Sequence, residues 1–88
     1  MTRKRVVVSG RVQGVFFRDT ARRRAESAGV AGWISNRPDG GVEAVFEGDP
    51  AAVDGLVEFC RRGPSRAEVA SVEVEEEEPE GLSGFSVT

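Results

Sequence analysis

The sequence predicts an α+β fold in which two helices cover one face of an antiparallel sheet. Three observations lead to this prediction. Segments that are rich in valine, or that alternate between apolar and polar residues, predict strands. Two further segments have apolar residues at helical spacing. Glycine, proline and aspartate separate these segments, and the resulting order is βαββαβ with one more short strand, within a single domain over residues 1–88.

The first strand and the first helix are predicted from the N-terminal third. Residues 4–12 are rich in valine, and Val6, Val8 and Val12 share one parity, as expected of a strand. The next apolar residues recur at spacings of four, four and three, which predicts one face of a helix formed by Phe17, Ala21, Ala25 and Ala28. Gly29 is a natural end for this helix, and Val30 can supply the accompanying apolar contact.

A hairpin is predicted next. Val30–Asn36 reads as a second strand, and PDGG at residues 38–41 combines a fixed φ with two residues that tolerate positive φ. The third strand is predicted from an alternation of apolar residues and glutamates, which consists of Val42, Glu43, Ala44, Phe46 and Glu47.

The second half of the chain predicts a helix and two strands. Asp49 is an N-cap residue, and Pro50 follows it at the first helical position. The helix has an apolar stripe with i, i+3, i+4, i+7 spacing at Val53, Leu56, Val57 and Cys60. Gly63 and Pro64 end it. A fourth strand is expected from Ala70, Val72 and Val74, and a short last strand from Phe85 and Val87.

This order of elements is that of the ferredoxin-like sandwich. A right-handed crossover makes the first and second strands run the same way, with the third strand between them. Their C-terminal ends then lie at the same end of the sheet, about 10 Å apart at ~4.8 Å per strand. Because Arg18 follows the first strand and Asn36 ends the second, both side chains are expected to reach a common point.

Composition excludes several classes of function. The chain is 39% apolar and 31% charged, as in a soluble globular protein, and has no apolar run near the roughly 18 residues of a membrane helix. Histidine and tyrosine are absent, which removes Ser–His–Asp and Cys–His catalysis and the commonest zinc ligand. The single cysteine, Cys60, suits a reducing compartment. We therefore expect a cytoplasmic protein that does not contact a membrane.

The net charge of −3 is unevenly distributed. Residues 1–24 carry eight basic side chains against one acid, so this third could meet an anion, nucleic acid included. Residues 68–80 carry seven glutamates and no base. The run Glu75–Glu78 is interpreted as a solvated strand end or loop.

The segment GRVQGVFFR, residues 10–18, is the strongest candidate for a functional loop. It turns from a strand into a helix, whose first amides lack intrahelical partners at the positive end of the dipole. Gly10 and Gly14 allow successive amides to converge, and Arg18 adds a planar fork that matches a phosphate or carboxylate edge. The segment therefore has the features of an anion cradle. Spacing alone leaves open the alternative of a tight connection with a surface arginine.

The same segment resembles the signature of the acylphosphatase family, G-[RK]-V-Q-G-V-x-[FY]-R. GWISN at residues 32–36 resembles the family's downstream strand motif, G-W-[VI]-x-N. The PDG turn, RRGP at 61–64 and GFSV at 84–87 are also similar, so the resemblance covers essentially the whole chain. It implies hydrolysis of the carboxyl–phosphate bond of acyl phosphates to a carboxylate and inorganic phosphate.

The resemblance also implies roles for individual residues. The phosphoryl group would be bound by Arg18 and by the loop amides of Gln13, Gly14, Val15, Phe16 and Phe17, while Asn36 would position the attacking water. It implies no metal and no organic cofactor. The expected partners are a small acyl phosphate and the product analogues phosphate or sulfate, with no nucleic acid, and the chain is expected to be a monomer. One departure is Arg37-Pro38 after the asparagine, which we expect to alter the rim of the site or the leaving-group preference.

Physical chemistry agrees with this activity in a chain that lacks histidine. The carboxylate leaving group needs no protonation near neutral pH, and phosphoryl transfer depends mainly on positioning and charge stabilisation. A phosphate oxygen of the substrate can take the proton of the water.

Three competing interpretations remain. CRRGPSR, residues 60–66, has the C-x5-R spacing of cysteine phosphatases, but Cys60 lies on the apolar stripe of a helix and is expected in the core. An RNA-binding module could use Trp33, Phe16 and Phe17 for stacking, although the net charge is negative and no RNP-type strand is present. The third is a domain that handles acyl phosphate or carbamoyl phosphate within a larger maturation enzyme. The short length of the chain favours a free-standing protein over this interpretation.

Overall fold

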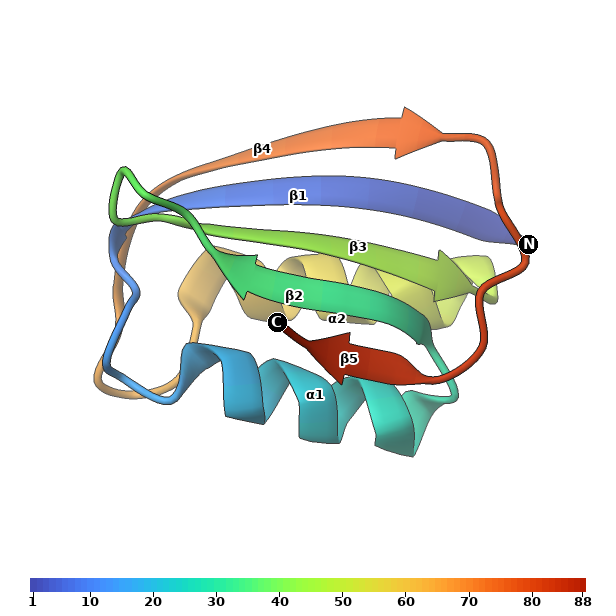
Figure 1. Cartoon of the computed structure of the whole chain (residues 1–88), viewed down its shortest axis with the longest axis horizontal. Coiled ribbons are helices and arrows are strands. Elements are labelled where there is room, and N and C mark those ends of the chain that lie inside the picture. Colours follow the sequence, from blue (N-terminus) through green and yellow to red (C-terminus); the bar gives the residue numbers. More distant parts are fainter.

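The elements follow one another in the predicted order. The computed structural model describes all residues from Met1 to Thr88. The strands and helices are β1 (Thr2–Arg11), α1 (Phe17–Ala28), β2 (Ala31–Asn36), β3 (Val42–Gly48), α2 (Pro50–Arg62), β4 (Glu68–Glu77) and β5 (Phe85–Val87). Both helices pack on the same face of one sheet, and the apolar core lies between the two layers (Figure 1). None of the helices is long and apolar enough to span a membrane.

The sheet has the strand order β4-β1-β3-β2-β5. β1 pairs with β3 and β4, and β2 pairs with β3, all antiparallel. β3 therefore lies between β1 and β2, as predicted, and the C-terminal ends of β1 and β2 lie at the same end of the sheet. β5 pairs with β2 in parallel, so the sheet is mixed and not wholly antiparallel. This last pairing places the C-terminus beside α1 (Figure 1).

Helix α1 buries Phe17, Ala21 and Ala25 against the sheet. Ala28, which shares their spacing, is exposed, since the helix ends there and the chain turns at Gly29. The Val30 amide donates to the Ala25 carbonyl at 2.8 Å and the Val30 side chain is buried, which confirms the apolar contact expected at this end of the helix.

Helix α2 begins as predicted. The Asp49 side chain accepts a hydrogen bond from the Ala51 amide at 3.2 Å, and Pro50 occupies the first turn. The predicted stripe is buried, including Cys60. Burial raises the pKa of the Cys60 thiol to about 12, so this cysteine is a core residue, and the resemblance of CRRGPSR to a phosphatase loop does not extend to a reactive thiolate.

Strand β4 forms where expected, but its apolar alternation does not hold throughout. The register with β1 shifts between Ser9 and Gly10, and the shift leaves Ala70 as an extra residue. Val69 and Val72 consequently pack against the core, whereas Ala70 is exposed.

Gly10 belongs to this irregularity and not to the predicted cradle. Its φ is +121°, and a Cβ there would lie 2.3 Å from the Glu68 carbonyl oxygen. Glycine is therefore required at this position for the close approach of β4.

The charges of the two termini neutralise one another on the open face of the sheet. Arg3 and Arg5 both donate to Glu77, at 2.9 and 2.7 Å. Arg5 also pairs with Glu43 and lies over the ring of Trp33. Glu77 is thus half-buried and paired, while the other three members of its acidic run are exposed, as expected of a solvated strand end. The basic N-terminal third offers less free positive charge than its composition indicates.

A buried carboxylate, Glu47 at the end of β3, holds the connection between β4 and β5. Its side chain is 1% exposed. It accepts hydrogen bonds from the amides of Glu80, Gly81 and Leu82 at 2.7–3.0 Å, and from the Arg3 guanidinium at 3.2 Å. The bonds from the Glu80 amide and its neighbours lower the pKa of Glu47 despite the opposing effect of burial.

We expect Glu47→Gln to lower the free energy of unfolding by about 3 kcal/mol at pH 7, because it removes one partner of a buried ion pair. A carboxyl group whose pKa is lowered by folding stabilises the protein at pH values above its unfolded-state pKa. This stabilisation is lost as the pH falls through its folded-state pKa. The difference between the wild type and Glu47→Gln should therefore narrow in acid. Urea unfolding across this pH range checks both points. Glu75→Gln, at an exposed position on β4, is the control, and an equal loss in both variants would contradict the role of Glu47.

Candidate active site

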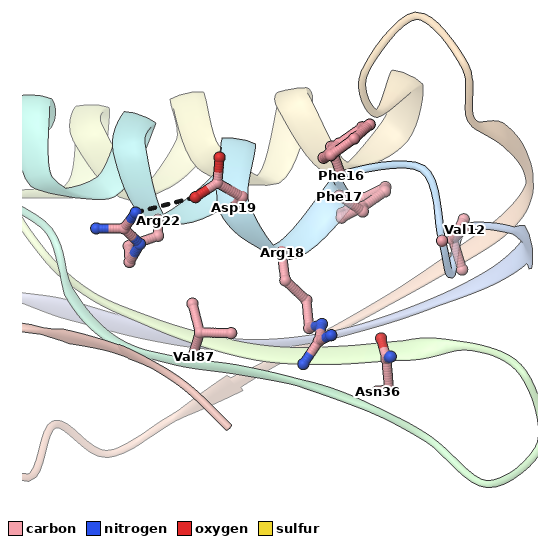
Figure 2. A pocket seen from close by; sticks show the side chains of 9 residues that line it. Val12, Phe16, Phe17, Arg18, Asp19, Arg22, Asn36 and Val87 are labelled. Carbon is pink, nitrogen blue, oxygen red and sulfur yellow. Dashed lines mark hydrogen bonds and ion pairs between the residues drawn. The ribbon is translucent and has the colours of Figure 1, made fainter.

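A cavity of about 380 Å³ lies where β2 ends and α1 begins (Figure 2). Its lining comes from the loop after β1, from the first two turns of α1, from the end of β2 and from β5. The lining residues are Val12, Gly14, Phe16, Phe17, Arg18, Asp19, Arg22, Asn36 and Val87. The predicted loop, Arg18 and Asn36 therefore meet at one cavity.

The loop between β1 and α1 has an unusual backbone. Gly14 has a φ of +72°, and Phe16 has a φ of +65° and is the only non-glycine residue of the chain with a positive φ. This conformation costs an L-residue on the order of 1 kcal/mol or more, and such strain is concentrated at functional sites. The Phe16 side chain is exposed, so apolar burial does not account for its position.

The start of α1 is not capped by a side chain. The Thr20 amide donates to the Phe16 carbonyl at 3.0 Å. The amides of Phe17, Arg18 and Asp19 precede this bond and have no acceptor within the helix. Helix α2, by contrast, is capped by Asp49. An uncapped helix start at the wall of a cavity favours an anion there.

Arg18 is the first charged residue of α1, and its side chain extends toward Asn36 (Figure 2). Its Nη1 donates to the main-chain oxygen of Thr88 at 3.0 Å. This contact orients the guanidinium from the side of β5 and leaves its other N–H groups free for a ligand. Asn36 is the last residue of β2 and is exposed.

The remaining predicted loop residues do not direct side chains into the cavity. Val15 is buried in the core. Gln13 donates through Nε2 to the carbonyls of Arg37 and Gly41, at 2.8 and 2.9 Å, and so ties the loop to the β2–β3 turn. Gln13 and Val15 can therefore contribute only their main-chain amides to the expected binding of the phosphoryl group.

Arg37 also lies outside the lining. It pairs with Asp39 at 3.2 Å and with Glu43 at 3.5 Å on the turn after β2. The departure at Arg37-Pro38 therefore lies in the turn, and Arg37 reaches the loop only through its main-chain carbonyl, which accepts from Gln13.

Four lining residues were not anticipated: Val12, Asp19, Arg22 and Val87. Arg22 lies one helical turn after Arg18, and this i, i+4 spacing could have indicated a shared face. Asp19 pairs with Arg22 at 2.9 Å and Arg23 at 2.7 Å, and the bond from Arg22 is the first cause of its lowered pKa. No local pattern could have indicated Val87, because the pairing of β5 with β2 brings it here.

Comparison with known proteins identifies the family. A model of the acylphosphatase family matches residues 4–87. The chain belongs to the acylphosphatase family. An acylphosphatase of Haloarcula marismortui is 59% identical over 86 residues, which cover 98% of this chain and 94% of that protein. The crystal structure of acylphosphatase from Bacillus subtilis superimposes with a TM-score of 0.95, at 38% identity, over 100% of this chain and 99% of that one. Hydrolysis of acyl phosphates is accordingly the activity of this acylphosphatase.

A further solved structure bears on the interpretation as a domain of a larger enzyme. T. kodakarensis HypF is 31% identical, with a TM-score of 0.81, over 99% of this chain but only 12% of the HypF chain. The acylphosphatase fold thus also occurs inside a much longer protein. This chain is more similar to acylphosphatases of nearly its own length, which supports the activity of an acylphosphatase.

Proposed function

We propose that Arg18, the loop amides from Gln13 to Phe17 and Asn36 carry out the hydrolysis of acyl phosphates in this protein. One observation carries the proposal: a guanidinium and a side-chain amide from two different elements converge on a cavity whose wall is an uncapped helix start. Arg18 and the amides bind the phosphoryl oxygens, and Asn36 orients a water molecule toward phosphorus.

The reaction is a single displacement. The water oxygen forms a bond to phosphorus while the bond between phosphorus and the carboxyl oxygen breaks. The carboxylate leaves without a proton, since its pKa lies well below neutrality. A phosphate oxygen of the substrate receives the proton of the water. The protein supplies charge and orientation, so the proposal includes neither a metal nor an organic cofactor.

In this proposal residues 1–88 act as one domain and as a monomer. The protein acts in the cytoplasm, to which a single buried cysteine is suited. It does not bind nucleic acid. The ion pairs of Arg3 and Arg5 with glutamates support this last point, since RNA would have to displace them from the open sheet face.

Inorganic phosphate is expected to bind the cavity as a product analogue. Phosphate at ten times its Kd stabilises the folded state by about 1.4 kcal/mol, which raises the Tm of a domain of this size by about 8 °C. Thermal unfolding in phosphate, against chloride at equal ionic strength, measures the shift, and backbone amide NMR shifts locate it. The shifts should be largest at residues 13–18 and absent in Arg18→Ala. An unchanged Tm and unchanged amide shifts at saturating phosphate would remove the cradle from the proposal.

A further inference from the structure

The cavity extends beyond the place where the phosphoryl group would bind. Only part of its volume of about 380 Å³ is needed for a phosphoryl group. The loop and Asn36 lie on one side of Arg18, whereas Val87 and Arg22 lie on the other side (Figure 2). The wall at this second end thus contains an apolar side chain and a second guanidinium.

The sheet register and the helix spacing place these two side chains at the same end. Val87 pairs with Ile34, two residues before Asn36 along β2. Arg22 lies one turn, about 6 Å, further along α1 than Arg18. Because α1 begins where β2 ends, moving along α1 corresponds to moving back along β2 (Figure 1). Val87 and Arg22 are therefore displaced from the Arg18–Asn36 pair in the same direction.

In-line displacement requires the attacking and leaving oxygens to lie on opposite sides of phosphorus. If Asn36 holds the water on one side, the acyl group must leave on the side of Val87 and Arg22. We propose that this end of the cavity is the acyl subsite, and that Arg22 selects acyl phosphates whose acyl group carries a second negative charge, such as a carboxylate. The proposal rests on the proposed function, because that function assigns the water to Asn36.

The charges around Arg22 leave it able to bind an anion. Asp19 divides its two oxygens between Arg22 and Arg23. Glu26 lies 3.5 Å from Arg22 and is more than half exposed, so it competes weakly. Of the charged side chains near Arg22, only Arg18 and Asp19 also line the cavity, so two guanidinium groups and one carboxylate line it together. Asp19 offers Arg22 only one oxygen. A substrate carboxylate can offer the guanidinium of Arg22 two oxygens.

The test compares two rigid substrates of nearly the same shape, 4-carboxybenzoyl phosphate and 4-carbamoylbenzoyl phosphate, which differ in one negative charge. The measured quantity is the ratio of their kcat/KM values. The wild type should prefer the carboxylate about fivefold, and the preference should fall with salt, as for a half-exposed ion pair. Arg22→Gln should remove the preference. Arg23→Gln is the matched control, because it also removes one positive charge and one Asp19 partner, but Arg23 does not line the cavity.

A ratio that falls in Arg22→Gln and persists in Arg23→Gln supports the subsite. A wild type without a preference, an equal loss of both activities in Arg22→Gln, or the same loss of preference in Arg23→Gln would overturn it. Failure of the proposed function has a different signature. In that case Arg18→Ala would retain turnover of both substrates, whatever the ratio between them.

Discussion

Arg18→Lys is expected to lower kcat/KM for acyl phosphate hydrolysis by about a thousandfold, the scale on which an arginine that stabilises phosphoryl transfer acts. Lysine retains the charge, but it loses the planar fork that binds two phosphoryl oxygens at once. The guanidinium can donate from Nη1 to the main-chain oxygen of Thr88 and bind the phosphoryl group with its other nitrogens. Lysine has only one nitrogen for both contacts. Arg18→Ala should lose at least as much.

The fold should survive both substitutions, because the Arg18 side chain lies at the cavity and not in the core. Steady-state kinetics with benzoyl phosphate in the presence of EDTA, together with the Tm of each variant, separates chemistry from folding. Arg23→Lys is the control, since Arg23 lies on the same helix, is largely exposed and does not line the cavity. A folded Arg18→Lys protein with kcat/KM near that of the wild type would exclude Arg18 from phosphoryl binding.

Asn36→Ala is expected to lower kcat about a hundredfold, the scale for loss of one oriented polar group in a transition state. The binding of inorganic phosphate should change little, because Arg18 and the loop amides remain. The split between turnover and phosphate affinity is the signature of a residue that acts on the water. It is measured by kcat and by the inhibition constant of phosphate in the same assay.

A purely structural role for Asn36 predicts a different result. Asparagine is common before turns, and in this alternative the turn after β2 depends on it. However, besides its backbone bonds, the turn is held by side-chain hydrogen bonds from Asp39, whose Oδ1 accepts from the Gly41 amide, and from Gln13. Asp39→Ala is therefore the matched control, which should lower stability and retain kcat at temperatures where it is folded. If Asn36→Ala behaves like Asp39→Ala, Asn36 has no part in the reaction.

Much of the fold is readable from local pattern. The stripe of α2, the stripe of α1 except for the exposed Ala28, the cap at Asp49 and the PDGG turn form as predicted, because each depends on residues close in sequence. Two details differ because they depend on neighbouring strands. The bulge at Ala70 exposes a residue that alternation would bury, and β5 pairs in parallel with β2. Strand pairing at the edge of a sheet is decided by the whole sheet, which a local pattern does not describe.

The sequence by itself determined the family, the order of the elements and the convergence of Arg18 with Asn36, because a motif and a right-handed crossover constrain them directly. It also assigned Gly10 to the cradle, whereas the structure uses this glycine for the close approach of β4. Only the tertiary structure decided what surrounds the two central residues. It placed Val87 in the cavity, set the Thr88 oxygen against Arg18 and turned the Gln13 side chain toward the hairpin. These contacts join residues that are 24 or more positions apart, so they arise from packing and strand register and leave no periodic trace in the chain.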